Sequence, residues 1–335
     1  MAKPRVSVLM PVYNSASTVE AAVLSMLRQT MPDFELVVVD DGSTDETPEI
    51  LRKLSRLDAR IIVRRTAHLG LVSALNTGLE YCSGELVARM DADDISHRFR
   101  LAEQVEFLDT HPEISVCGSL VRIFPRKNLL GGMIRYEQWL NSLVNPEEIA
   151  RDIFVESPVV HPSVMLRRSE LVELGGYRDA HWVEDYDLWL RFHLSGKRIA
   201  KVPRTLLFWR HTADRVTMTD PRCSVEAFLR AKAHYLGIML RSIGRPVVLW
   251  GAGQTGRRLL KHLMREGVAP EAVVDIDPKK IGGRLRGVPV VAPDWLVGKF
   301  VFVVAAVSSL GARELIRERL REMGFAESRD FLCAA

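Results

Sequence analysis

The first 120 residues alternate short apolar runs with segments in which apolar residues recur every three or four positions. The apolar runs predict β-strands at residues 6–11, 35–39, 61–64 and 86–90. The periodic segments predict helices at 18–28, 47–57 and 71–81. Strands that alternate with crossover helices form a mostly parallel sheet, so the pattern predicts an α/β fold.

The pattern is less regular over the next 120 residues. It predicts helices at 98–112 and 184–194, a strand at 159–166, and a long amphipathic helix at 223–243. Residues 125–150 lack a clear period and contain Gly131 and Gly132, which indicates a mobile or substrate-facing segment. The amphipathic helix either packs on the preceding domain, which we favour, or touches a membrane surface.

A second alternating pattern starts at Arg245. It predicts strands at 246–250, 272–276, 288–291 and 300–304, and helices at 257–266 and 312–323. The sequence therefore predicts three parts: a large α/β domain at 1–222, a linker helix at 223–243, and a smaller Rossmann-like α/β domain at 244–335.

Composition supports a globular chain with more than one core. Of 335 residues, 47% are hydrophobic and 26% are charged, and the net charge is +4. Residues 244–335 hold 15 Lys and Arg against 10 Asp and Glu, so this segment carries +5 and the remainder −1. The small overall excess argues against a general nucleic-acid binder.

Cysteine spacing and hydropathy bear on the compartment. The four cysteines form no CxxC pair, which argues against a cysteine-based zinc site and favours reduced thiols. No stretch reaches the ~18 apolar residues that a spanning helix needs. We expect a soluble cytoplasmic protein, or one peripheral to the inner face of a membrane.

Polar residues follow three of the predicted strands at the point where each ends. They are Asn14, the pair Asp40 and Asp41, and the pair Asp91 and Asp93. Ligands of parallel sheets bind beyond the carboxyl ends of the strands, so we expect these residues to converge on one crevice.

The acidic motifs admit two interpretations each. Carboxylates at 91, 93 and 94 suit Mg²⁺ or Mn²⁺ with a substrate phosphate, or form a solvated turn in which Asp94 caps the next helix. Asp40 suits a base or a ribose, while Thr44 or Asp45 caps the helix at 47–57 and leaves Asp40 available.

Seven ordered blocks within residues 5–215 resemble family-2 glycosyltransferases of the GT-A fold. The blocks are 11–14 (Pro-Val-Tyr-Asn), 39–45 (Val-Asp-Asp-Gly-Ser-Thr-Asp), 91–94 (Asp-Ala-Asp-Asp), 161–163 (His-Pro-Ser), 175–177 (Gly-Gly-Tyr), 184–189 (Glu-Asp-Tyr-Asp-Leu-Trp) and 209–211 (Trp-Arg-His). The resemblance implies inverting transfer of a sugar from a nucleotide diphosphate-sugar, with a UDP-sugar expected, to a hydroxyl acceptor in polysaccharide or glycoconjugate synthesis.

The resemblance also implies a role for individual residues. The donor would be bound by Pro11, Val12, Tyr13, Asn14, Asp40, Asp41, Asn76, Asp91, Ala92 and Asp93. Asp93 and His211 would hold Mn²⁺ or Mg²⁺. Asp185 would be the catalytic base, with Trp182 and Glu184 in the acceptor site; without the family, Glu184 and Asp185 would simply complement a helix dipole. His68 stands where many relatives have Asn, which bears on the base and sugar preference.

The C-terminal segment carries a glycine pattern typical of phosphate-binding turns. Gly251, Gly253 and Gly256 follow a predicted strand and open a helix, and Asp275 and Asp277 end the next strand. The segment resembles the small nucleotide-binding-like domains attached to polysaccharide-biosynthesis enzymes. It binds NAD(P) or another nucleotide, or it has a structural, regulatory or oligomerising role.

The expected partners are the nucleotide diphosphate-sugar and a glycan, lipid-linked or protein acceptor, with no nucleic acid. Peripheral membrane contact and a homo-oligomer are left open. Two alternatives compete with catalysis by the first domain: a catalytically silent scaffold that binds nucleotide-sugars, and an NAD(P)-linked enzyme that uses the C-terminal domain.

Overall fold

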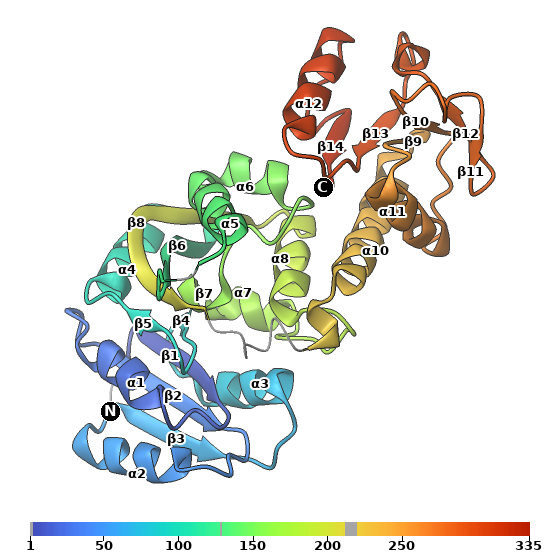
Figure 1. The fold of residues 1–335 in the computed structure, drawn as a ribbon. Helices are drawn as coiled ribbons and strands as arrows, with labels where there is room; N and C mark the ends of the chain where they lie inside the picture. Colours follow the sequence, from blue (N-terminus) through green and yellow to red (C-terminus); the bar gives the residue numbers. More distant parts are fainter. Residues whose placement is uncertain (1–2, 128, 212–219) are drawn as a thin grey trace. The chain divides into compact units, whose positions relative to one another are not determined.

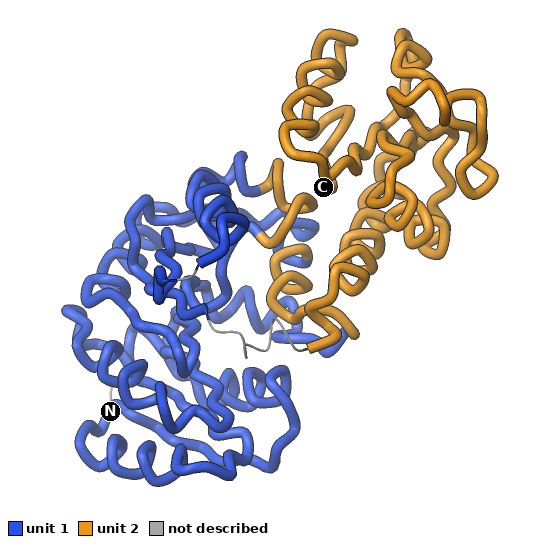
Figure 2. The backbone as a smooth tube through the Cα atoms, viewed as in Figure 1, with its two compact units in different colours: residues 1–149, 158–180, 191–215 blue, residues 150–157, 181–190, 216–335 orange. Residues whose placement is uncertain are grey.

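The computed structural model describes residues 3–127, 129–211 and 220–335 and divides into two compact units (Figure 1, Figure 2). The first unit comprises Met1–Ile149, Pro158–Ala180 and Arg191–Arg215. The second comprises Ala150–Ser157, His181–Leu190 and Val216–Ala335, so two short segments from the middle of the chain belong to it. The domain limits at 222 and 244 stay a prediction.

The first half of the large sheet is parallel, as the alternating pattern predicts. Three of its four strands are largely buried, the edge strand is only partly buried, and helices connect consecutive strands. The elements are β1 (Val6–Val12), α1 (Val19–Leu27), β2 (Phe34–Asp40), α2 (Thr47–Leu57), β3 (Ile61–Arg65), α3 (Leu71–Tyr81) and β4 (Leu86–Arg89). The α/β fold class is therefore confirmed.

The second half of the sheet contains two long strands that the sequence analysis missed. The strand order is β3-β2-β1-β4-β7-β6-β8-β5, in which β6 and β8 pair in parallel and β7 is antiparallel to both of its neighbours. The added strands and helices are β5 (Ile95–Ser96), α4 (Arg100–Thr110), β6 (Ile114–Phe124), β7 (Met165–Arg167), α7 (Arg168–Glu173), α8 (Glu184–Leu194) and β8 (Arg198–Arg210).

The middle of the chain differs from the sequence pattern at two places. Residues 125–150, which lack a clear period, hold helices α5 (Gly131–Ser142) and α6 (Pro146–Asp152), and the substrate-facing role of this segment stays a prediction. The buried Glu137 of α5 accepts hydrogen bonds from the Ile123 N–H and the Arg126 guanidinium, which fixes the helix to β6. The predicted strand at 159–166 is a short 3-10 helix, His161–Ser163, followed by β7, because His161-Pro162 favours a turn.

The second unit contains a six-stranded sheet in the order β11-β12-β10-β9-β13-β14, parallel except for β11. Its main helix, α10 (Val225–Ile243), begins where the Ser224 side chain accepts the Ala227 N–H and ends at Gly244 in a left-handed conformation. The remaining elements are β9 (Val247–Trp250), α11 (Gln254–Arg265), β10 (Ala272–Val274), β11 (Arg284–Leu285), β12 (Val288–Val291), β13 (Phe302–Ala305), α12 (Ala312–Glu322) and β14 (Phe331–Cys333). Among the residues that the structure describes, no helix is both long and apolar enough to span a bilayer.

A buried lysine in β8 predicts an unusual pH dependence of stability. Lys201 is 1% exposed, its Nζ donates to the Leu140 carbonyl at 2.5 Å, and burial lowers the pKa of its ammonium group to about 7. The unfolded chain keeps this proton up to the ordinary lysine pKa, so the unfolded state binds more protons between pH 7 and 10. The free energy of unfolding should therefore gain up to about 1 kcal/mol per pH unit from this residue as the pH rises through that window.

Urea unfolding at pH 7 and pH 9 tests this dependence. Lys201→Met should flatten the rise, whereas Lys53→Met, at an exposed position of α2, should keep the wild-type slope. Equal slopes in the wild type and Lys201→Met would show that Lys201 is not neutral in the folded chain.

Candidate active site

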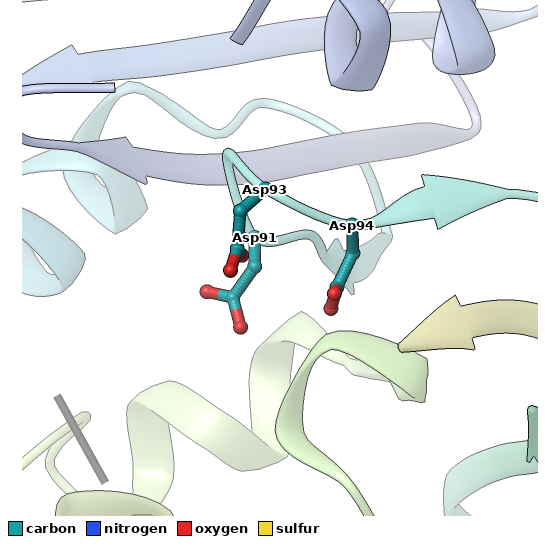
Figure 3. A group of neighbouring side chains, drawn as sticks. All are labelled: Asp91, Asp93 and Asp94. Atoms are coloured by element: carbon teal, nitrogen blue, oxygen red, sulfur yellow. The ribbon is translucent and has the colours of Figure 1, made fainter. Parts of the chain in front are cut away.

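Three carboxylates gather on the loop that follows β4. The ligand atoms of Asp91, Asp93 and Asp94 lie within 4.8 Å of one another, and the three side chains point to the same side of the loop (Figure 3). Asp94 is fully buried, while Asp91 and Asp93 are partly exposed. A group of this kind suits a hard divalent cation, because such ions prefer carboxylate oxygens.

Buried guanidinium groups hold this loop in place. Arg89, 3% exposed, lies with its Nη1 2.5 Å from Asp91 Oδ1. The Arg210 N–H donates to Asp94 Oδ1 at 2.7 Å, and Arg210 Nε donates to the Asp93 carbonyl at 2.6 Å. The fully buried Arg100 donates to the carbonyls of Arg89 and Val164 at 2.7 and 3.1 Å. Together these contacts fix both the backbone and the carboxylates of the loop.

The charge balance of the loop shows in the pKa of Arg100. Burial is the main cause that lowers the pKa of its guanidinium to about 9; the Asp94 carboxylate opposes this shift and the neighbouring Arg89 adds to it. Asp94 thus compensates a buried cation. Its predicted role as a helix cap is wrong, since β5 follows it directly and α4 begins only at Arg100.

His211 lies outside the carboxylate group. Its N–H donates to the Phe124 carbonyl at 2.8 Å, which extends the pairing of β8 with β6 by one residue. The group of candidate metal ligands among the described residues contains Asp94 in addition to Asp91 and Asp93, and does not contain His211. A metal contact by His211 stays a prediction, and residues 212–215, the end of the stretch that resembles the family, lie outside the described residues.

The predicted donor residues at the ends of β1 and β2 form a compact turn. Pro11 and Val12 are buried, and Tyr13 and Asn14 are exposed. Asn14 has a positive φ of 46°, and its Oδ1 accepts the Thr44 N–H at 2.8 Å. This hydrogen bond ties the polar ends of β1 and β2 together, as the sequence predicts.

Asp40 and Asp41 are both buried and both engaged. Asp40 accepts the Ser43 N–H at 2.9 Å and lies 3.4 Å from Arg65 Nε, so it is less available than the sequence suggests. Asp41 accepts hydrogen bonds at 2.9 Å from the Leu69 and Gly70 N–H groups and from His68 Nδ1. Asp41 therefore shapes the 68–70 loop, and its contact with a donor stays a prediction.

His68, the departure from the family pattern, stacks on Tyr13. The two ring centroids are 4.0 Å apart with an interplanar angle of 15°. Asn76 has a structural partner in the backbone of Tyr177, whose N–H it accepts at 3.0 Å and to whose carbonyl it donates at 2.9 Å. Ala92, within the acidic loop, is buried.

The predicted base lies at the start of α8, in the second unit. Asp185 is partly exposed, and its Oδ1 accepts the Tyr186 N–H at 2.6 Å. Glu184 is buried, and the Trp182 indole donates from Nε1 to Asp187 Oδ1 at 2.8 Å. The sequence analysis did not single out Asp187, because its second partner, the Tyr235 hydroxyl, lies 48 residues away along the chain.

In the second unit, the carboxylate of Asp275 accepts a hydrogen bond from the backbone of the glycine turn. Asp275 accepts the Ala252 N–H at 2.7 Å and the Asp277 N–H at 2.9 Å. Burial raises the pKa of the Asp275 carboxyl, but these hydrogen bonds and Lys280 outweigh it and leave the pKa lowered.

Two of the three glycines of this turn are needed for packing. Gly251 has a φ of 122°, and a Cβ at Gly256 would lie 1.8 Å from the Gly251 carbonyl oxygen, whereas Gly253 faces open space. Packing therefore explains Gly251 and Gly256 without a ligand but does not explain Gly253, and nucleotide binding at this turn stays a prediction.

Comparison with known proteins decides the family. The family model described as Glycosyl transferase family 2 matches residues 7–175, a stretch that contains the acidic loop and both donor turns. The chain belongs to glycosyltransferase family 2. It is therefore an enzyme that transfers sugars.

Relatives of this glycosyltransferase include two bacterial glycosyltransferases whose names state a donor, an acceptor or a product. The amylovoran biosynthesis glycosyltransferase AmsE of Erwinia amylovora is 32% identical over 213 residues, 63% of this chain and 77% of AmsE. A UDP-Gal:alpha-D-GlcNAc-diphosphoundecaprenol beta-1,3-galactosyltransferase of Escherichia coli is 28% identical over 218 residues, 63% of this chain and 77% of the relative.

Solved structures support the GT-A-type fold of this glycosyltransferase. S. aureus TarS 1–349 in complex with UDP-GlcNAc aligns with a TM-score of 0.58 at 21% identity, covering 80% of this chain and 74% of that one. The mannosyltransferase PcManGT of Pyrobaculum calidifontis, in complex with GDP-Man and Mn²⁺, aligns with a TM-score of 0.52 at 22% identity, covering 80% and 71%. This chain spans 42% of the longer TarS chain.

The acidic loop predicts a specific loss of cation binding. Asp93→Asn replaces one charged ligand by a neutral one, so the dissociation constant for Mn²⁺ alone should rise at least about tenfold. Electron paramagnetic resonance of unbound Mn²⁺ measures it. Asp294→Asn, whose side chain is 79% exposed in the second unit, should leave the affinity unchanged. Equal affinity in the wild type and Asp93→Asn would remove Asp93 from the cation site.

Proposed function

We propose that this glycosyltransferase moves a sugar from a UDP-sugar to a hydroxyl group of a glycan or lipid-linked acceptor, with inversion at the anomeric carbon. The observation that carries the proposal is the group formed by Asp91, Asp93 and Asp94 at the carboxyl end of β4. It lies where ligands bind to α/β sheets and offers carboxylate ligands for a divalent cation, which a diphosphate can bind on its other side.

The relatives support the choice of donor and acceptor. The name of the E. coli relative specifies UDP-Gal and a diphosphoundecaprenol acceptor, and the name of AmsE specifies amylovoran biosynthesis. TarS was solved with UDP-GlcNAc. A uridine nucleotide is therefore the proposed carrier, and assembly of a polysaccharide or glycoconjugate the proposed setting.

Asp91 and Asp93 are the residues proposed to hold Mn²⁺ or Mg²⁺, since they are the partly exposed members of the group. When bound, the cation neutralises charge on the leaving diphosphate. Arg89 and Arg210 keep the loop in one conformation before the donor arrives, which lowers the cost of ordering the site.

Asp185 is the proposed base. Its carboxylate takes the proton from the acceptor hydroxyl as that oxygen attacks the anomeric carbon from the face opposite the diphosphate. The hydrogen bond from the Tyr186 N–H fixes the orientation of the carboxylate, and Trp182 and Glu184 border the proposed acceptor site. Binding both substrates turns a bimolecular step into a local one.

Removing the base without changing its shape tests this role. Asp185→Asn should lower the rate of transfer by about 10²–10⁴-fold, the usual contribution of a general base. Transfer is measured as sugar incorporated into a hydroxyl acceptor. Binding of the UDP-sugar, followed by calorimetry, should not change. A near wild-type rate for Asp185→Asn would overturn the assignment of the base.

The same assay separates catalysis from a silent scaffold. In the presence of Mn²⁺ the wild-type chain should release UDP from the donor and transfer the sugar, whereas a scaffold would bind the donor without turnover. If the chain binds a UDP-sugar but releases UDP with none of the UDP-sugars and acceptors tried, the result would favour the scaffold.

A further inference from the structure

We infer that Asp187 and Tyr235 are positioning residues of the acceptor site, through which helix α10 holds the indole of Trp182. The inference rests on the proposed function, in which Trp182 borders the acceptor. It gives the second unit a part in the transfer reaction that does not need a nucleotide at its glycine turn. All of the residues concerned belong to the second unit.

Trp182 is attached to α10 by several different contacts. Its ring centroid lies 5.5 Å from that of His234 and 6.4 Å from that of Tyr235, the latter edge-on at 72°. Next to it in the chain, the His181 carbonyl accepts a hydrogen bond from Arg230 at 3.1 Å. Aromatic contacts at these separations favour one orientation of the indole.

Asp187 joins the indole to Tyr235 through a single oxygen. Asp187 is 1% exposed, and its Oδ1 accepts both the Trp182 Nε1–H at 2.8 Å and the Tyr235 hydroxyl at 2.5 Å. Hydrogen bonds to an ionised acceptor are about twice as strong as neutral ones. Because both donors share this oxygen, the position of the indole depends on the Tyr235 hydroxyl.

The start of α8 therefore presents two carboxylates with different tasks. Asp185 is partly exposed, as a group that meets a substrate must be, whereas Asp187 two residues later is buried against α10. Tyr186 between them is stacked on Phe228 of α10, with centroids 5.2 Å apart, and its hydroxyl donates to the Ile153 carbonyl at 2.8 Å.

Helix α10 is itself well anchored, so it can serve as a rigid support. Glu226 in its first turn accepts hydrogen bonds from Arg258, Lys261 and His262 of α11. The buried Lys232 donates to the Val155 carbonyl at 2.6 Å. Helices and strands hold functional side chains more accurately than loops do. Because Trp182 contacts the anchored helix α10, its side chain is held in place although it lies on a loop.

Tyr235→Phe tests the inference in the full-length chain, because it removes one hydroxyl and keeps the ring. The KM for the acceptor should rise about tenfold, as expected for a lost hydrogen bond to a charged group. The KM for the UDP-sugar and the rate of donor hydrolysis by water should stay at wild-type values. Tyr81→Phe is the control: it also removes a tyrosine hydroxyl and keeps the ring, at a 43% exposed position of α3 that has no part in the proposed site.

Amide hydrogen exchange provides a second test, which does not depend on enzymatic activity and can be measured on variants that have lost activity. Amide hydrogen exchange of residues 178–183 should become faster in Tyr235→Phe and not in Tyr81→Phe. Asp187→Asn, which keeps an acceptor oxygen, should lie between Tyr235→Phe and Asp187→Ala in the exchange rate of this segment.

The outcomes separate the inference from the proposed function. Unchanged exchange at 178–183 in Tyr235→Phe would overturn the positioning role, whatever the enzyme does. Faster exchange with an unchanged acceptor KM would also overturn it, since the indole would then be held but not used. If the exchange result holds and no UDP-sugar supports transfer by the wild type, the proposed function fails while the contact itself stands.

Discussion

The candidate active site depends on compensation of buried charge at the carboxyl end of β4. Arg100 is fully buried and Arg89 almost so, a costly arrangement unless the charges are paired and hydrogen-bonded. The Asp94 carboxylate and the carbonyls of Arg89 and Val164 provide those partners. The same residues set the path of the loop. One hydrogen-bond and ion-pair network therefore both stabilises the fold and orients Asp91 and Asp93.

A second buried carboxylate plays a comparable part in the other unit. Asp187 joins the start of α8 to α10, as Asp94 joins the acidic loop to β8 through the Arg210 N–H. In each case a buried Asp lies one or two residues from a partly exposed Asp, to which we assign chemistry.

Features that depend on residues close together in the sequence were predicted, whereas features that depend on distant residues were not. The elements from β1 to β4 have uninterrupted apolar patterns, and α2 and α3 were predicted at their observed limits. The long strands β6 and β8 were missed because Gly118, Lys201 and Pro203 interrupt their patterns, and their pairing shifts register at three points. The family blocks located the acidic loop, but the role of Asp94 depends on Arg210, 116 residues away. The link between Asp187 and Tyr235 spans 48 residues and had no signal in the sequence.

Donor binding that depends on a cation at the β4 loop is the central claim of this account. Thermal unfolding with a panel of UDP-sugars, with and without Mn²⁺, tests it most directly, because a ligand that binds only the folded chain raises the midpoint by mass action. The account predicts a clear rise for at least one UDP-sugar with Mn²⁺ and a much smaller one without it. A midpoint that no UDP-sugar moves, or that moves equally with and without Mn²⁺, would contradict it.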